Sequence, residues 1–296
     1  MFLVTGATGT VGREVVRHFP AYLPVRVMAR DPAGVTDPGR TVETVTGDHR
    51  DPRSLARALT GVRAAFLVTN RVAGDDDAQF LKAARAAGIR RVVKLSAAAV
   101  LDPRAEDLIT RWQRANEELL RASGMEWTLL RPRAFMSNTL SWAGSIRSEG
   151  VVRALHGTAA NACVDPRDIA RIAVRAMTED AHAGRAYTLT GPAAISAVEQ
   201  TEQLSRLLGV PLRFAELSPH EARALLARRH PEPVVEALLE SALRLRKGAK
   251  TRTEDTIRAV TGHPAGTFEA WAERHVSAFA PEAGAPVLRR GGAVTP

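Results

Sequence analysis

The amino-acid sequence predicts an α/β fold, with a doubly wound parallel sheet covered by helices on both faces and a smaller, mainly helical part after it. Two observations carry this prediction. Short apolar, β-branched runs alternate with longer amphipathic segments through the first two thirds of the 296 residues, which is typical of βαβ units. Several of these runs are apolar at every position, as expected for strands that are buried on both faces.

The predicted elements follow one another in regular order. The expected strands cover residues 2–5, 24–29, 42–46, 64–69, 91–96 and 127–131. The expected helices between them cover residues 11–19, 52–58, 76–87 and 105–123. Acidic residues 75–77 are typical of a helix N-terminus, and Gly88 and Gly124 are typical of helix ends.

After Arg131 the alternation becomes looser. Residues 134–150 have the composition of a connection with small residues and a few aromatic ones. Asp165 is expected to cap a helix with Pro166 in its first turn, and the same capping accounts for Asp168. A further strand is expected over 186–190, and from Ser196 the chain is expected to be entirely helical, with helices over 198–208, 219–229, 233–246 and 267–279.

Composition and charge exclude several classes of protein. The net charge is +9, but the basic residues are interleaved with acids and only 5% of residues are aromatic, so we expect a solvated, arginine-rich surface and no nucleic-acid partner. The apolar runs are shorter than the ~18–20 residues that span a bilayer. Met1 leads directly into an apolar strand, so we expect no signal peptide, no membrane association and a cytoplasmic location. Cys163 is the only cysteine, and no metal-ligand spacing is present, so no metal is expected.

A glycine-rich turn is the strongest local motif. Gly6, Gly9 and Gly12 directly follow the first strand and open the first helix, with the spacing G-x-x-G-x-x-G instead of the usual G-x-G-x-x-G. Glycines at such positions permit a tight turn, close approach to a pyrophosphate and close packing of helix on strand. The helix N-terminus adds N–H groups and the positive end of its dipole. We therefore expect this turn to bind a dinucleotide; the alternative is a turn without a ligand.

The residue that ends the second strand indicates which dinucleotide is bound. An acid there would hold the ribose 2′-hydroxyl of NAD, whereas an arginine accommodates the 2′-phosphate of NADP. In this chain the strand ends at Arg30, and Asp31 comes only after it. A guanidinium is a planar fork suited to phosphate. The sequence therefore predicts NADP(H) in preference to NAD(H), unless Arg30 is an ordinary surface arginine.

Together these motifs resemble those of the atypical short-chain dehydrogenase/reductase (SDR) superfamily, and within it the NmrA-like NAD(P)-binding proteins. The matching segments are residues 5–12, 25–30, 47–48, 93–96, 123–124, 127–132, 138, 165–168 and 187–192. The resemblance implies a Rossmann domain over residues 1–133 and a smaller substrate-binding part over 134–280, from which 165–192 returns to the Rossmann sheet. Residues 281–296 are rich in Gly, Pro and Arg and are expected to form a flexible tail.

The resemblance also implies which residues bind the ligands. The pyrophosphate would lie against Gly6, Thr8, Gly9, Thr10, Val11 and Gly12. The 2′-phosphate would contact Arg30, the adenine region Asp48 and His49, and the nicotinamide side Thr69 and Ser96. The loop after residues 131–132 would line the pocket of a small-molecule substrate with Phe135, Met136, Asn138 and Trp142. The alternative for Phe135, Met136 and Trp142 is a core role joining the two parts.

One expected feature of short-chain dehydrogenases is missing. Most of them use a tyrosine whose pKa is lowered by a lysine four residues later. Here Tyr22 is followed at that spacing by Arg26, and Tyr187 by Gly191. Gln113 stands where NmrA-like reductases often carry His or Lys, and a glutamine cannot donate a proton. Ser96, Gln113 and Asn116 remain as candidate catalytic residues, and Glu117 is interpreted as a structural or solvated helix residue.

The missing dyad narrows the expected reaction. Hydride transfer needs no protein acid, because the cofactor carries the chemistry. A substrate whose reduced form is a stable anion can take its proton from water, so the sequence favours NADPH-dependent reduction of a small apolar or aromatic quinone, enone or imine. The alternatives are a non-catalytic NADP(H)-sensing regulator of the NmrA type and an isomerase or ring-closing enzyme. The helical C-terminal third offers surfaces for a homodimer.

Overall fold

The structure, a computed structural model, describes residues 1–35 and 42–280. Within these residues, seven strands form one parallel sheet with the order β3-β2-β1-β4-β5-β6-β8. The strands are β1 (Phe2–Thr5), β2 (Val25–Ala29), β3 (Glu43–Thr46), β4 (Ala64–Leu67), β5 (Arg91–Leu95), β6 (Glu126–Pro132) and β8 (Arg185–Leu189). The predicted Rossmann-type fold is confirmed, and the strand order reverses between β1 and β4, where such sheets bind ligands.

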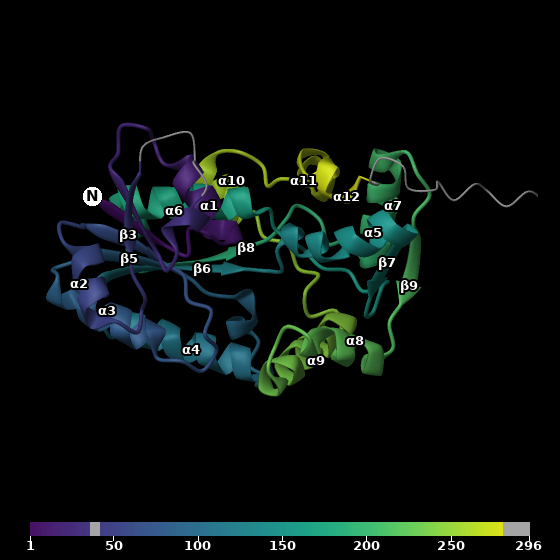
Figure 1. The fold of residues 1–296 in the computed structure, drawn as a ribbon, viewed down its shortest axis with the longest axis horizontal. Coiled ribbons are helices and arrows are strands. Elements are labelled where there is room, and N and C mark those ends of the chain that lie inside the picture. Colours follow the sequence, from purple (N-terminus) through teal and green to yellow (C-terminus); the bar gives the residue numbers. More distant parts are fainter. Residues whose placement is uncertain (36–41, 281–296) are drawn as a thin grey trace, which may run out of the picture.

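Helices cover both faces of the sheet (Figure 1). The alternation of β1 shows how the two faces are built: Phe2 and Val4 belong to one buried cluster, and Leu3 belongs to the other. The first cluster includes residues of α1 (Thr10–His18) and α6 (Pro166–Thr178). The second includes residues of α2 (Pro52–Leu59), α3 (Asp76–Ala86) and α4 (Leu108–Arg121). Short 3₁₀ turns cover Pro32–Gly34, Ala98–Leu101 and Asp180–His182.

The C-terminal part lies beside the sheet and has its own core around Met136, Phe268 and Trp271. Two short strands, β7 (Val151–Ala154) and β9 (Arg213–Glu216), pair in parallel. The helices of this part are α5 (Ala143–Glu149), α7 (Ala197–Leu208), α8 (Pro219–Ala227), α9 (Glu232–Arg246), α10 (Thr256–Thr261), α11 (Phe268–Arg274) and α12 (Val276–Phe279). No helix of residues 1–35 and 42–280 is long and apolar enough to span a bilayer.

Three predictions about this part were wrong. Residues 134–150 are not an irregular connection, because a 3₁₀ helix (Met136–Trp142) leads into α5. The chain after Ser196 is not entirely helical, because β9 interrupts it. The single helix expected over 267–279 is divided at His275 into α11 and α12, and α10 precedes it. Elements of four to seven residues contain too few turns or alternations for a periodic pattern to emerge. The predicted tail, 281–296, lies outside the described residues.

Helix starts are capped largely as the sequence predicts. Asp165 caps α6 by accepting a hydrogen bond from the Arg167 N–H at 2.9 Å. The capping prediction for Asp168 was wrong: its carboxylate accepts a hydrogen bond from the Gly266 N–H at 2.7 Å and pairs with Arg171 at 3.0 Å. Burial raises the pKa of Asp168. This carboxylate therefore ties α6 to the segment before α11, which is distant in the sequence.

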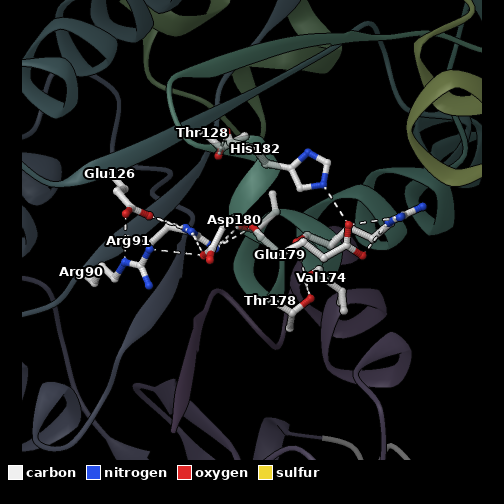
Figure 2. Close-up of polar contacts among 11 residues, drawn as sticks. Arg90, Arg91, Glu126, Thr128, Val174, Thr178, Glu179, Asp180 and His182 are labelled. Atoms are coloured by element: carbon white, nitrogen blue, oxygen red, sulfur yellow. Dashed lines mark hydrogen bonds and ion pairs between the residues drawn. The ribbon is translucent and has the colours of Figure 1, made fainter.

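A polar cluster fastens the amino-terminal ends of β5 and β6 to the end of α6 (Figure 2). Arg91 is 4% exposed and forms ion pairs of 2.7 Å with Glu126 and with Asp180. It also donates to the main-chain oxygen of Glu179 at 2.7 Å. This cluster lies at the end of the sheet opposite the glycine-rich turn, so it leaves the carboxyl ends of the strands for the site.

Candidate functional site

The glycine-rich turn has the geometry of a phosphate-binding loop. Gly6 has a φ of +64°, a conformation that residues with a side chain rarely adopt. A Cβ atom on Gly12 would lie 2.2 Å from the main-chain oxygen of Gly6, so only glycine fits there. The Thr5 hydroxyl accepts a hydrogen bond from the Val68 N–H at 2.8 Å, which joins the ends of β1 and β4 beneath the turn. The turn therefore stands at the point where the strand order reverses.

The first helix begins without a side-chain cap. Side chains of Asp51, Asp107, Asp165, Ser196 and Ser218 cap the helices that follow them. Gly9 occupies the corresponding position of α1 and has no side chain with which to cap it. Thr8, Gly9 and Thr10 are exposed. The first N–H groups of α1 are therefore left for another acceptor, and a pyrophosphate is the acceptor that fits this position.

Arg30 and Asp48 lie after β2 and β3 at the same edge of the sheet. Arg30 is exposed, as a residue that binds a ligand phosphate needs to be. Asp48 pairs with Arg50 at 2.8 Å. Hydrogen bonds from Arg50 hold the pKa of Asp48 far below its usual range, and the charge of Arg30 acts in the same direction. Arg30 is thus close enough to Asp48 for its charge to act on the carboxylate.

His49 and Thr69 border a buried ion pair that the sequence analysis missed. Asp77 of α3 and Lys94 of β5 are 1% and 0% exposed and pair with each other. The Thr69 hydroxyl donates to Asp77 at 2.5 Å. Burial lowers the pKa of His49, which therefore stays neutral at pH 7, although the charges of Asp76 and Asp77 act the other way. A lysine in the middle of an apolar strand is the signal that could have predicted such a partner.

Ser96 belongs to a second buried polar group. Its hydroxyl donates to the carboxylate of Glu117 in α4 at 2.6 Å. Arg131 of β6 donates to the same carboxylate at 2.5 and 2.9 Å, and Arg121 at 3.0 Å. Burial would raise the pKa of Glu117, but the hydrogen bonds from Arg131 and Ser96 outweigh it, so the pKa lies below its ordinary value. Glu117 is therefore buried and ionised, not solvated, and it orients Ser96.

Gln113 and Asn116 lie on the same buried side of α4 as Glu117. Gln113 is 9% exposed and Asn116 is 3% exposed. The Gln113 Oε1 and Asn116 Nδ2 atoms are buried and have no hydrogen-bond partner among residues 1–35 and 42–280. A buried amide atom without a hydrogen-bond partner lowers the stability of the fold by its desolvation free energy. These two atoms therefore offer one acceptor and one donor to a bound molecule.

The four residues of the predicted substrate pocket are dispersed. Met136 is buried and lines a cavity of about 240 Å³ with Cys163 and Phe268, among others. Phe135 packs against the core of the sheet, and Trp142 against the core of the C-terminal part. Asn138 is exposed. Of the four, Met136 alone lines this cavity. Burial raises the pKa of the Cys163 thiol to about 11, so the cavity presents a neutral thiol.

The chain is similar to known NAD(P)H-binding proteins. A family model described as NAD(P)H-binding matches residues 6–180. The chain is 56% identical over 282 residues to the (4-alkanoyl-5-oxo-2,5-dihydrofuran-3-yl)methyl phosphate reductase of Streptomyces griseus, covering 95% of this chain and 100% of that one. It is 37% identical to the NAD(P)H azoreductase of Xenophilus azovorans, with 94% and 99% covered. The NADPH complex of an NADPH-dependent quinone oxidoreductase from Escherichia coli aligns with a TM-score of 0.79 at 25% identity, with 94% and 100% covered.

The similarities to these three proteins extend over nearly the whole chain, and the match to the family model includes the glycine-rich turn. They confirm the relationship to NmrA-like atypical short-chain dehydrogenases/reductases that the motifs indicated. The protein is an NAD(P)H-dependent reductase. It follows that the chain belongs to the family of NAD(P)H-binding proteins.

Proposed function

We propose that this reductase uses NADPH to saturate the ring double bond of a phosphorylated butenolide, a 5-oxo-2,5-dihydrofuran with an acyl group on C4 and a phosphorylated methyl group on C3. The relative that is 56% identical over its whole length is named for a substrate of this kind. The observation that carries the proposal is the character of the polar groups around Ser96: they offer hydrogen bonds, while their one carboxylic acid, Glu117, is ionised. Such a site favours a substrate that needs no protein acid.

The chemistry of this substrate fits that restriction. Bound NADPH would supply a hydride to C3, the carbon β to both carbonyl groups. The substrate then carries an enolate whose charge is shared by the lactone and acyl oxygens. Such a stabilised anion can take its proton at C4 from water, which completes the addition of one hydride and one proton across the double bond. A simple ketone would instead leave an alkoxide, which requires an acid close to the reacting oxygen.

The residues of this chain would then bind and orient. The turn from Gly6 to Gly12 would hold the pyrophosphate, and Arg30 the 2′-phosphate. Asp48 and His49 would border the adenine, and Thr69 and Ser96 the nicotinamide side. The buried Nδ2 of Asn116 would donate a hydrogen bond to an enolate oxygen as its charge develops, which is the arrangement that stabilises an oxyanion.

The substrate is tested by comparing acceptors at saturating NADPH. We expect the butenolide phosphate to be reduced with a kcat/KM at least ~100-fold above that of a simple quinone or ketone. The reason is that the polar groups of the site would match the oxygens of this substrate and not those of the other two. NADPH absorbance follows the rate, and the product mass shows two added hydrogens. If a quinone is reduced rapidly and the butenolide phosphate is not reduced at all, the protein is a quinone reductase. Tight NADPH binding without any turnover would support the sensing function instead.

Replacing Arg30 by glutamate is expected to weaken NADPH binding by roughly 10- to 100-fold, because the charge-assisted hydrogen bonds to the 2′-phosphate are lost. NADH carries no such phosphate, so its affinity should change by less than about threefold. Fluorescence titration with both cofactors measures the two constants. Arg104→Glu is the matched control, since the Arg104 side chain is 89% exposed and pairs only loosely with Asp102, at 3.6 Å. Equal losses for NADPH and NADH would show that Arg30 does not contact the 2′-phosphate.

Replacing Asn116 by leucine is expected to lower kcat for the butenolide by roughly 10²–10³-fold, the usual effect of removing one oxyanion donor. The Kd of NADPH should not change. Because Nδ2 has no hydrogen-bond partner among the described residues, the substitution removes no internal bond of that atom, and the melting temperature should be maintained. Single-turnover kinetics and thermal unfolding measure the two quantities. A normal kcat in the folded variant would exclude Asn116 as the donor.

A further inference from the structure

Two basic side chains at the carboxyl end of the sheet have no acidic partner. Arg133 directly follows β6 and continues its pairing with β8, because its N–H donates to the Leu189 oxygen at 2.9 Å. Lys250 follows α9, and its main-chain oxygen accepts a hydrogen bond from the Ala162 N–H at 2.9 Å. Across residues 1–35 and 42–280, neither side chain takes part in an ion pair. Both are partly buried.

The neighbouring charges are already paired. Arg244 of α9 forms an ion pair of 2.5 Å with Asp107, the residue that caps α4. The two helices are neighbours (Figure 1). Arg252 pairs with Glu254 at 2.8 Å. Of the acids whose charge acts on the two cations, Asp107 and Glu254 are thus paired with other arginines, and Asp102 lies 3.6 Å from Arg104. An additional anion would balance Arg133 and Lys250.

Lys250 is held in a position that disfavours its charge. Its ammonium donates to the Ser241 hydroxyl at 2.7 Å. Burial is the main cause that lowers the pKa of Lys250 to about 8; the positive charges of Arg244 and Arg133 act in the same direction, and Cys163 and Asp107 act the opposite way. A basic residue that is kept from acids in this way gains most from a bound anion.

Arg133 shows the same lack of a partner. Its Nε is buried and has no hydrogen-bond partner within the described part of the chain. Burial lowers the pKa of Arg133, with Glu254 acting in the opposite direction. A guanidinium stays protonated in proteins, so this N–H remains a donor at neutral pH. Phosphate is the group whose oxygens suit such a planar donor, particularly with an ammonium beside it.

Arg133 lies close to the polar residues around Ser96, where the substrate is proposed to react. Arg131 and Arg133 are two residues apart in extended chain that pairs with β8, so they are on the same face and about 7 Å apart. Arg131 holds Glu117, which in turn holds Ser96. Arg133 therefore lies one strand repeat beyond the polar group around Ser96. In the proposed substrate, one methylene and one oxygen separate the phosphorus from the carbon that accepts the hydride.

We propose that Arg133 and Lys250 bind the phosphate group of the substrate and so determine its specificity for a phosphate monoester. This inference rests on the proposed function, since it assigns the residues that recognise one part of that substrate. The two residues position the ring for hydride transfer through the phosphate. They take no part in the chemical step.

The test compares the butenolide phosphate with the corresponding free alcohol, using the full-length protein saturated with NADPH. For Arg133→Met and Lys250→Met we expect the KM of the phosphate ester to rise roughly 10- to 100-fold each, while the kinetic constants for the alcohol change less than about twofold. Lys250→Arg should retain most of the affinity. Arg252→Met, which removes an exposed arginine already paired with Glu254, is the control. Variants that raise both KM values equally would show a structural role only and overturn the inference.

The pH dependence gives an independent check. Substrate phosphate is a dianion above pH ~7, so any further change reports on the protein. Because the pKa of free Lys250 is about 8, the charged form needed for binding is lost as the pH rises through that value. The KM of the phosphate ester should therefore increase between pH 7.5 and 9.5 in the natural protein, up to about tenfold per unit. It should be flat in Lys250→Arg and Lys250→Met. A rise of the same size in all three would contradict the assignment.

A binding experiment separates failure of this inference from failure of the proposed function. Calorimetric titration of phenyl phosphate into the protein saturated with NADP⁺ tests the anion site without turnover. Binding that is lost in the Arg133→Met/Lys250→Met double variant would support the site even if the butenolide is not a substrate. Reduction of the phosphate ester and the alcohol with equal KM by the natural protein would support the function and overturn the phosphate site. Absence of phenyl phosphate binding would also overturn it.

Discussion

Replacing Gly12 by alanine is expected to raise the Kd of NADPH at least ~100-fold and to destabilise the fold by about 1–3 kcal/mol. The added Cβ would lie 2.2 Å from the oxygen and 2.6 Å from the carbonyl carbon of Gly6, and 2.9 Å from the nitrogen of Ala7. All three are main-chain atoms, which cannot rotate away as a side chain would. The turn must therefore move away from α1, and the N–H groups that would face the pyrophosphate lose their alignment.

The control for this substitution is Gly144→Ala. Gly144 lies in α5, and a Cβ there would meet no atom within 4 Å. Alanine is favoured over glycine in helices, so this variant should be at least as stable as the natural protein and bind NADPH normally. Calorimetry for the cofactor and thermal unfolding for stability measure both variants. Normal NADPH affinity in folded Gly12→Ala would show that the glycine-rich turn does not hold the pyrophosphate.

The Rossmann sheet could be predicted because its signals are local. Strands such as β1 and β4 are apolar throughout, and each is followed by an amphipathic helix long enough to show its period. The glycine-rich turn was recognisable for a related reason, since the φ of Gly6 is one that other residues rarely adopt and a Cβ at position 12 would clash with the main chain. In contrast, β7 and β9 are four residues each and pair across about 60 residues of chain. Their strand character depends on that distant pairing, which composition does not reveal.

The candidate site was predictable only in part, for the same physical reason. Ser96 and the α4 residues Gln113 and Asn116 could be identified by their places in the motifs. That Glu117 is buried between Arg131 and Ser96 depends on the packing of α4 against β5 and β6. The basic residues were expected to form a solvated surface, whereas Arg244 pairs with Asp107, which is 137 positions away, and Lys250 is partly buried. Charges that are buried in the fold cannot be distinguished from surface charges by sequence spacing alone.

Replacing Asp77 by leucine is expected to destabilise the protein by roughly 3–5 kcal/mol, because the buried ammonium of Lys94 loses its partner. Lys94 is 0% exposed, and its Nζ lies 5.9 Å from the centroid of the Trp112 ring, which is a weak substitute for a carboxylate. The Thr69 hydroxyl loses its acceptor as well. In a chain of this size the melting temperature should fall by about 10 °C, and thermal unfolding at neutral pH measures the change.

The neighbouring Asp75 provides a matched control, because it is also an acid at the start of α3. Its side chain is 60% exposed and pairs with Arg71 at 2.6 Å, so Asp75→Leu should cost no more than about 1 kcal/mol. The double variant Lys94→Met/Asp77→Leu removes both buried charges and should recover most of the lost stability, since an apolar pair of similar volume avoids the desolvation of both ions. If the double variant is as unstable as Asp77→Leu alone, the instability comes from packing around Thr69 and not from an unpaired charge. The affinity of the double variant for NADPH shows whether the ion pair also positions Thr69 for the cofactor.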